Sequence, residues 1–305
     1  MQTKVKLTKR VVSLATALVT GLSAVGVTGI PGGVFGTLSA SAEDGHNYVN
    51  GFCTDEGCAS PYEPATEENG TYQIANAGNL YWFAEQVNDG NANLNAALTT
   101  DIVVNEGNLA NYDGTSENTW REWTPIAADY GRYKGTFDGQ GHTISGLYFN
   151  DSSAECIGIV GDLGRGGVIQ NVGLENSYFH VYQYTAGICG YNSGTIRNCY
   201  NAGTVIGEFI IIGGIVGAFE VGTVSNCYNT GNITGKSDVG GVCGNNMMRS
   251  NTIENCYNTG NITGDMDLGG ICGENTANAI IKNCYNIGNV TGTDKRIGGI
   301  IGRNA

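Results

Sequence analysis

The sequence predicts an all-β chain: a right-handed parallel β-helix with three strands per coil and a capping helix at its N-terminal end. Two repeated phrases, spaced 27–29 residues apart, carry this prediction. The first is Gly-Gly-Ile/Val-x-Gly, at 213–217, 240–244, 269–273 and 298–302. The second is Asn-Cys-Tyr-Asn, at 198–201, 226–229, 255–258 and 283–286. Short apolar runs between Gly and Asn turns fit one coil per repeat, with parallel strands stacked about 4.8 Å apart.

The composition agrees with a turn-rich solenoid. Gly accounts for 49 of 305 residues and Pro for only 4, which suits many turns that need a residue tolerant of positive φ. Hydrophobic residues make up 41% of the chain, enough to form a core, so the composition excludes a disordered protein. The formal net charge of −13 argues against nucleic acid or an anionic membrane surface as a partner.

The first 42 residues predict a signal peptide. Residues 1–10 contain four cations and no acid, residues 11–38 are apolar and small, and Ala40-Ser41-Ala42 forms an A-x-A cleavage pattern. A membrane anchor is the alternative, but several Gly residues and Pro31 interrupt the run. No second apolar run of spanning length follows. We therefore expect a secreted or cell-surface protein with no membrane span after cleavage.

Residues 43–70 predict a polar linker that contains the pair Cys53 and Cys58. His46 lies nearby, which raises the possibility of a metal site. Structural zinc normally takes four ligands, and only three soft candidates are present here. A local disulfide or two free thiols are therefore favoured over zinc.

Residues 71–150 predict the cap and the first coils. A helix is expected over 76–88, with Asn76 as N-cap, because its apolar residues recur at i, i+3, i+4 and i+7. Such a helix would cover the open end of the first coil. His142 lies in a Gly-rich turn with no carboxylate or nucleophile near it in the sequence, so a turn role is favoured over general-base catalysis.

Residues 151–305 predict the repeats, ending mid-coil. One column across the coils is cysteine: Cys199, Cys227, Cys256 and Cys284. Val172 holds the same position in the first coil, so we expect these thiols to pack as small core residues. Disulfides between coils, and less readily a metal-binding ladder, remain open alternatives.

A second column predicts a hydrogen-bonded amide ladder that satisfies buried groups at an inward turn. Its members are Asn198, Asn226, Asn255 and Asn283, preceded by Asn171. Under this interpretation Asn255→Ala would leave buried donors unpaired, at a cost of about 1–3 kcal/mol.

Candidate reactive groups are sparse. Asp238 and Asp267 each stand two residues before Gly-Gly, so they should stack one coil apart and could hold Ca²⁺ weakly. We identify no catalytic residue, no firm metal site and no cofactor-binding residue in the sequence.

The Gly-Gly-Ile-Val-Gly phrase at 213–217 and its copies, with the segment at 135–149, resemble the GLUG-motif repeat proteins. The resemblance covers residues 71–305, although Ile or Val replaces the Leu of the motif. It implies a pectin-lyase-like solenoid in a secreted or surface protein of a Gram-positive-type bacterium. It brings no catalytic residues.

The favoured function is a non-catalytic surface module for adhesion or for interaction with a ligand such as a polysaccharide or a surface protein. One alternative is a polysaccharide lyase or glycoside hydrolase on a β-helix. Another is a passive spacer of a larger surface protein. Large aromatic residues beside paired acids in a cleft would favour the enzyme, and exposed Tyr columns without acids would favour binding.

Overall fold

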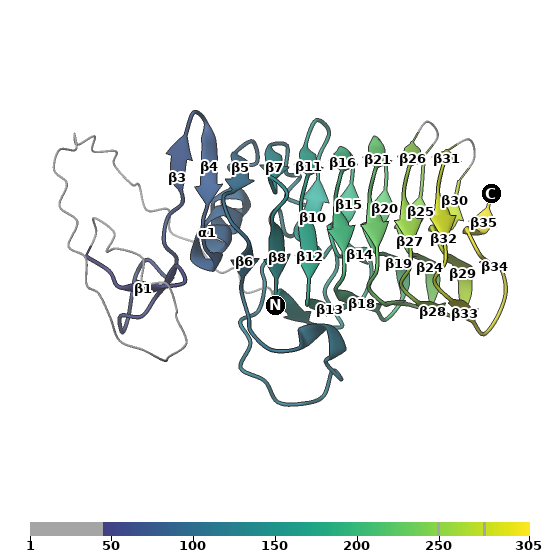
Figure 1. Ribbon diagram of the computed structural model, residues 1–305, viewed down its shortest axis with the longest axis horizontal. Coiled ribbons are helices and arrows are strands. Elements are labelled where there is room, and N and C mark those ends of the chain that lie inside the picture. Colours follow the sequence, from purple (N-terminus) through teal and green to yellow (C-terminus); the bar gives the residue numbers. More distant parts are fainter. Residues whose placement is uncertain (1–44, 249–250, 277–278) are drawn as a thin grey trace, which may run out of the picture. The chain divides into compact units, whose positions relative to one another are not determined.

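A computed structural model describes residues 45–248, 251–276 and 279–305, so the expected signal peptide lies outside the described residues. The described chain is a parallel β-helix, as the repeats predict (Figure 1). Apart from two antiparallel pairs near the N-terminal end of the described chain, the strands pair in parallel with the equivalent strand of a neighbouring coil. The tyrosines of four successive Asn-Cys-Tyr-Asn phrases are direct partners, from Tyr200 through Tyr228 and Tyr257 to Tyr285.

A coil contains five short strands instead of the expected three. In one coil they are β15 (Cys189–Asn192), β16 (Thr195–Arg197), β17 (Tyr200–Asn201), β18 (Thr204–Gly207) and β19 (Ile210–Gly213). One of the additional breaks falls at Asn198, whose φ of 55° turns the chain between β16 and β17. We name each sheet after the strand that this coil contributes.

The β15 sheet contains, besides β15, β10 (Val160–Leu163), β20 (Val216–Phe219), β25 (Cys243–Asn246), β30 (Cys272–Asn275) and β35 (Ile301–Asn304). The β16 sheet contains β3 (Thr66–Glu68), β4 (Thr71–Ile74), β5 (Asn95–Leu98), β7 (Thr136–Asp138), β11 (Val168–Gln170), β21 (Thr223–Ser225), β26 (Thr252–Glu254) and β31 (Ile280–Lys282). The β17 sheet contains β6 (Ile102–Val103), β8 (Thr143–Ser145), β12 (Gly173–Glu175), β22 (Tyr228–Asn229), β27 (Tyr257–Asn258) and β32 (Tyr285–Asn286).

The β18 sheet contains β9 (Tyr148–Asn150), β13 (Tyr178–Val181), β23 (Ile233–Thr234), β28 (Ile262–Gly264) and β33 (Val290–Gly292). The β19 sheet contains β14 (Thr185–Ala186), β24 (Ser237–Gly240), β29 (Met266–Gly269) and β34 (Ile297–Gly298). A 3₁₀ turn, η1 (Leu109–Asn111), lies in the long connection between β6 and β7.

The core runs along the inside of the coils. Cys199, Cys227 and Cys256 are buried among aliphatic side chains, and Cys284 in the last coil is partly buried. All four are free thiols. Burial strongly raises the pKa of the Cys227 thiol, so this thiol stays protonated and packs as a small core residue.

Helix α1 (Ala77–Asn88) covers the N-terminal end of the core, beside β4 and β5 (Figure 1). Asn76 is its N-cap and accepts a hydrogen bond of 2.8 Å from the Asn79 backbone N–H. The apolar stripe that the spacing predicts is fully buried, and Phe83 lies within 6.3 Å, ring to ring, of Phe137 in the next coil.

The segment expected to be a linker has structure of its own. Strands β1 (Tyr48–Val49) and β2 (Phe52–Cys53) form an antiparallel pair, and Cys53 is disulfide-bonded to Cys58. Its backbone packs directly on α1, because a Cβ placed on Gly51 would lie 2.7 Å from the Cα of Gly78. This short segment is therefore part of the cap.

None of the helices in the described part of the chain is long and apolar enough to cross a membrane.

Candidate functional site

The most regular feature of the outer surface is a column of stacked tyrosines. Successive ring centroids are 4.9, 4.8 and 5.1 Å apart and the ring planes are within 5° of parallel. The side chains of a strand alternate between its two faces, so in each two-residue strand of the β17 sheet the Tyr points outward and the Asn inward. The column consists of Tyr200, Tyr228, Tyr257 and Tyr285.

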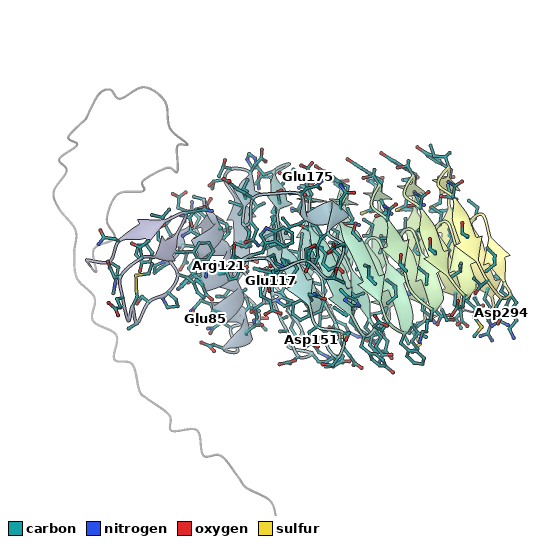
Figure 2. All side chains as sticks on the ribbon, turned by 90° about the horizontal axis from the view of Figure 1, so that it is seen from below. Glu85, Glu117, Arg121, Asp151, Glu175 and Asp294 are labelled. Carbon is teal, nitrogen blue, oxygen red and sulfur yellow. A yellow bond between two sulfur atoms is a disulfide. The ribbon has the colours of Figure 1, made fainter. Side chains whose placement is uncertain are left out.

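Stacking determines what this column offers to a ligand. Each inner ring is covered on both faces by its neighbours, so the accessible parts are the ring edges and the phenol hydroxyls. Tyr285 in the last coil is 52% exposed. Tyr200 donates a hydrogen bond of 2.5 Å to Glu175, which lies on the outside of the coils (Figure 2). Burial and this carboxylate raise the pKa of Tyr200, so the phenol stays neutral.

An exposed amide ladder runs beside the tyrosines. Each side-chain amide in it donates to the side-chain oxygen of the residue one coil before, at 2.9 Å for the first link and 3.2 Å for the others. The ladder contains Asn171, Asn198, Asn226, Asn255 and Asn283. From Asn198 onward the side chains are exposed at a positive-φ turn. The expectation that this column is buried was therefore wrong, although its coil-to-coil bonds are present.

The buried ladder is a different column, which the sequence reasoning missed. Its amides are linked from coil to coil at 2.8, 2.7 and 2.8 Å. Each amide nitrogen also donates to the backbone oxygen of the Gly two residues ahead. The members are Asn201, Asn229, Asn258 and Asn286, the last residues of the Asn-Cys-Tyr-Asn phrases.

A third amide column follows the tyrosines along the chain, whereas the exposed ladder precedes them. Asn232, Asn261 and Asn289 are exposed and linked at 3.2 Å. The coils of Tyr228, Tyr257 and Tyr285 thus each present an Asn, a Tyr and an Asn in turn, whereas the coil of Tyr200 has Thr204 at the third position. We call these three outer columns together, beginning at Asn198, Tyr200 and Asn232, the tyrosine face.

The calcium candidates Asp238 and Asp267 do lie in adjacent coils, and both have positive φ. Ser237 connects them, with its hydroxyl 3.3 Å from Asp238 and 3.4 Å from Asp267. Arg296 binds the Asp267 carboxylate through two nitrogens, one at 2.8 Å. Because this guanidinium already neutralises Asp267, calcium binding at the pair remains a prediction that the contact disfavours.

No basic side chain in the described part of the chain forms an ion pair with Asp238. Its carboxylate is 3.3 Å from the Asn245 amide nitrogen, and burial followed by the nearby charge of Glu274 raises its pKa to about 6.

His142 has a carboxylate partner that its sequence neighbourhood does not reveal. Its Nδ1 lies 3.2 Å from the Asp101 carboxylate, which also accepts a hydrogen bond of 2.9 Å from the Thr143 backbone N–H. His142 borders a polar cavity of about 560 Å³ that is also lined by Glu68 and Thr99. Since Asp101 anchors the turn by both bonds, a turn role accounts for the contact.

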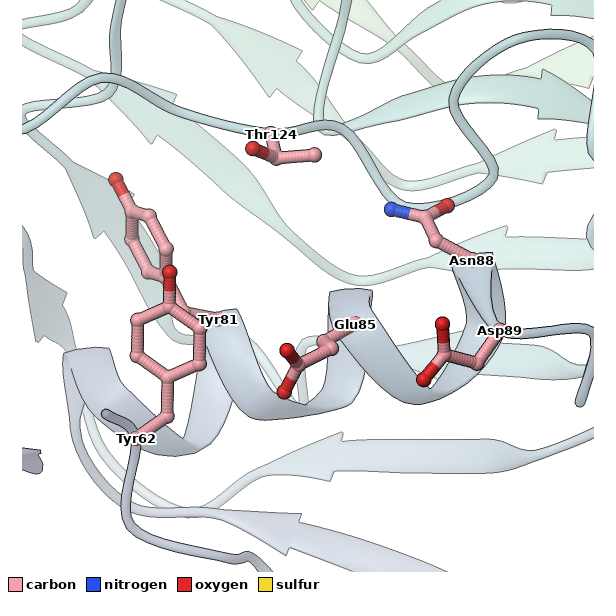
Figure 3. Close-up of a pocket in the computed structure, with 6 residues that line it drawn as sticks. All are labelled: Tyr62, Tyr81, Glu85, Asn88, Asp89 and Thr124. Carbon is pink, nitrogen blue, oxygen red and sulfur yellow. The ribbon is translucent and has the colours of Figure 1, made fainter. Parts of the chain in front are cut away.

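A smaller cavity of about 200 Å³ lies between α1 and the segment before β7 (Figure 3). Tyr62 and Tyr81 form one end and Glu85 and Asp89 the other. This arrangement of aromatic residues and acids is the pattern named above as favouring an enzyme. However, both acids project from one face of one helix, whereas glycoside hydrolysis needs two carboxylates flanking the bond. Burial raises the pKa of Glu85, and the negative charge of Asp89 raises it further.

Among the described residues, His46, Cys53 and Cys58 form one group with ligand atoms within 4.8 Å of one another. These are the three residues considered for zinc from the sequence.

Comparison with known proteins agrees with this geometry. The GLUG motif matches residues 182–206 and 264–291, which span β14 to β18 and β28 to β33. The chain carries the GLUG motif at these two positions. The resemblance stated from the repeated phrases is therefore confirmed, and the repeat with its β-solenoid fits a structural module.

Two relatives share part of the sequence. Halomucin of Haloquadratum walsbyi is 31% identical over 214 residues, which is 66% of this chain and 2% of halomucin. A candidate Gly-rich membrane protein of Evansella cellulosilytica is 32% identical over 79 residues, 25% of this chain and 9% of that protein. The GLUG chain thus spans only a small fraction of either relative.

One solved structure is similar in fold. A candidate immunoglobulin A1 protease from Bacteroides ovatus superposes with a TM-score of 0.56 at 25% sequence identity. The match covers 77% of this chain and 72% of that one. It supports the solenoid architecture.

Proposed function

We propose that this GLUG solenoid is a non-catalytic module of a secreted or surface protein, and that its tyrosine face binds an extended, neutral polysaccharide. The observation that carries the proposal is the regular outer array of phenol hydroxyls and side-chain amides. These groups are uncharged donors and acceptors, like the hydroxyls of a neutral sugar.

The spacing of the array suits a polymer better than a small molecule. Equivalent groups repeat once per coil, about 4.8 Å apart, so a chain lying along the solenoid axis meets the same set of partners at every coil. Individually weak hydrogen bonds then act together, because each bound unit raises the effective concentration of the next. A single monosaccharide gains no such advantage.

The stacking of the tyrosines also defines the mode of contact. Inner ring faces are occupied by neighbouring tyrosines, so a sugar ring cannot stack on them and hydrogen bonding to ring-edge hydroxyls has to supply the affinity.

Location at the cell surface is supported by the expected signal peptide and by the kinds of protein that share the sequence, a mucin-named protein and a protein named as a membrane protein. A non-catalytic role is supported by the arrangement of acids described above. Asp267 is bound by Arg296, and Glu85 and Asp89 share one side of α1.

The test is affinity electrophoresis of the full chain in gels that contain a neutral β-glucan, a neutral galactomannan or acidic pectin. The double variant Tyr228→Phe/Tyr257→Phe removes two hydroxyls and keeps the stacked rings. At about 0.5–1.5 kcal/mol per hydrogen bond, it should weaken binding to the neutral polymer about 5- to 150-fold.

Tyr182→Phe is the matched control, because Tyr182 is also an exposed, stacked tyrosine but packs on Phe209 away from the tyrosine face. Its affinity should equal that of the unmodified chain. If the unmodified chain migrates freely through all three polymers, the proposal fails and a passive spacer becomes the better interpretation. Cleavage of any polymer would instead favour the enzyme.

A further inference from the structure

We propose that the loop of residues 46–58 binds one Zn²⁺ ion through His46, Cys53, Asp55 and Cys58 when the Cys53–Cys58 disulfide is reduced. Counting only soft ligands leaves three candidates in this segment. The structure adds an oxygen ligand, the Asp55 carboxylate, to complete a set of four.

Four of the six distances between the ligand atoms fit a tetrahedral ion. His46 Nδ1 lies 3.3 Å from Cys58 Sγ and 3.8 Å from Cys53 Sγ. Asp55 Oδ2 lies 3.6 Å from His46 Nδ1 and 3.8 Å from Cys53 Sγ. For zinc–ligand bonds of about 2.0–2.3 Å, tetrahedral geometry places neighbouring ligand atoms about 3.3–3.8 Å apart. These four contacts therefore match four of the six edges of a coordination tetrahedron. The other two edges form only on reduction: the two sulfur atoms have to separate, and the Asp55 carboxylate, which lies outside the group with all ligand atoms within 4.8 Å of one another, has to approach Cys58.

The local fold explains why the four groups converge. Strands β1 and β2 pair so that Tyr48 lies opposite Cys53, and the Thr54 backbone N–H donates to the Asn47 oxygen at 2.9 Å. The residue before β1 is thereby held beside the turn that follows β2. Without this hairpin, His46 and Cys58 would be 12 positions apart on an open chain.

Asp55 is oriented as a metal ligand would be. The Asn47 backbone N–H and side-chain amide each donate to its carboxylate at 3.0 Å. Outer hydrogen bonds of this kind fix the direction of ligating groups in metal sites.

The disulfide and the metal site exclude each other. Two molecules of a low-molecular-weight thiol reduce the Cys53–Cys58 bond to two thiols and are themselves oxidised to one disulfide. Zn²⁺ then displaces one proton from each cysteine thiol and binds the two thiolates, neutral His46 and ionised Asp55. Either state closes the same loop, which lies against α1 at the contact between Gly51 and Gly78.

The test uses the full chain, reduced with a phosphine and desalted without oxygen. Co²⁺ is titrated first, because tetrahedral Co²⁺ with thiolate ligands gives intense visible bands and a near-ultraviolet charge-transfer band. Zn²⁺ is then added as competitor. We expect one equivalent of Co²⁺ per chain with a tetrahedral spectrum, displacement by one equivalent of Zn²⁺, and no binding by the oxidised chain.

Variants assign the site. His46→Gln and Asp55→Asn should each weaken Zn²⁺ binding about 10- to 100-fold or more and change the Co²⁺ spectrum, while Cys53→Ser should abolish the thiolate bands. His142→Gln is the control for a histidine elsewhere, and Cys256→Val controls for metal bound by the thiols of the core. Both controls should bind like the unmodified chain.

Two results would overturn the proposal. One is a reduced chain that binds no stoichiometric Co²⁺ or Zn²⁺. The other is wild-type affinity and spectrum in both His46→Gln and Asp55→Asn. Should Cys53→Ser fail to fold, the difference between oxidised and reduced unmodified chain provides the same thiol test.

Discussion

The buried amide ladder predicts a large effect of one substitution, Asn258→Ala. The Asn258 amide nitrogen donates at 2.8 Å both to Asn286 in the next coil and to the Gly260 oxygen. Its side-chain oxygen accepts a hydrogen bond of 2.7 Å from Asn229 in the coil before. All of these contacts are on the inside of the solenoid, where Asn258 is fully buried.

The magnitude follows from the partners that remain. Asn229 keeps its bond to Gly231 but loses the acceptor of its second proton, and Gly260 loses a donor to its oxygen. Asn286 is less affected, because its oxygen still accepts from the Gly288 backbone. Two orphaned buried groups at about 1–3 kcal/mol each give a loss of about 2–6 kcal/mol in the free energy of unfolding.

Urea unfolding followed by circular dichroism measures this loss. The matched control is Asn255→Gly in the exposed ladder of the same coil, where solvent replaces the lost bonds and Gly tolerates the φ of 54°. We expect the control to cost less than about 1 kcal/mol. Equal losses in the two variants, or a loss below about 1 kcal/mol for Asn258→Ala, would refute the assignment of the buried ladder.

Three further predictions concern other parts of the coil. Burial raises the pKa of Asp238 to about 6, so the stability it contributes is present below its ordinary pKa of about 4 and is lost as the pH rises through 6; Asp238→Asn should therefore raise the melting temperature at pH 8 and have little effect at pH 3.5. Cys227→Val should change the free energy of unfolding by less than about 1.5 kcal/mol, and the Cys227 thiol should react with a thiol reagent only after denaturation. Gly241→Ala should prevent folding, because its Cβ would lie 2.3 Å from Asn258 Cγ and 2.3 Å from the Gly270 oxygen. Gly299→Ala, where a Cβ meets nothing within 4 Å, should express and melt like the unmodified chain.

The stacking of the coils could be predicted from the sequence because every repeat carries the same phrases. Phrases such as Asn-Cys-Tyr-Asn specify their own partner one coil away, and the register follows from aligning them. The helix over Ala77–Asn88 was equally predictable from its apolar spacing and from its N-cap at Asn76.

The side-chain directions of the two amide columns can be derived from the cysteine column between them. Placing Cys199 inside the coil, as its exchange with Val implies, fixes the neighbouring directions by strand alternation. Tyr200 then points out, Asn201 points in, and Asn198 on the other side of the cysteine points out. The burial of the Cys column therefore implies both the exposure of Asn198 and the burial of Asn201.

Other features depend on contacts that no repeat encodes. Asp101 meets His142 across 41 residues, and Asp55 joins His46 and the cysteine pair only once the β1–β2 hairpin has formed. The division of a coil into five strands depends on where each turn enters positive φ. Asn tolerates that conformation more readily than most residues but does not require it.

The tyrosine column and the buried asparagine ladder occupy adjacent residues of the same short strands in the β17 sheet. Because one points outward and the other inward, they have different roles. Inner amides such as Asn258 hold neighbouring coils at the spacing that lets Tyr257 stack on the rings next to it. A change inside the coil therefore disturbs the tyrosine face, whereas Tyr257→Phe alters the face and leaves the inner bonds intact. Binding on this surface can consequently change from one repeat to the next at little cost in stability, provided that the buried asparagine and the tightly packed glycines such as Gly241 are retained.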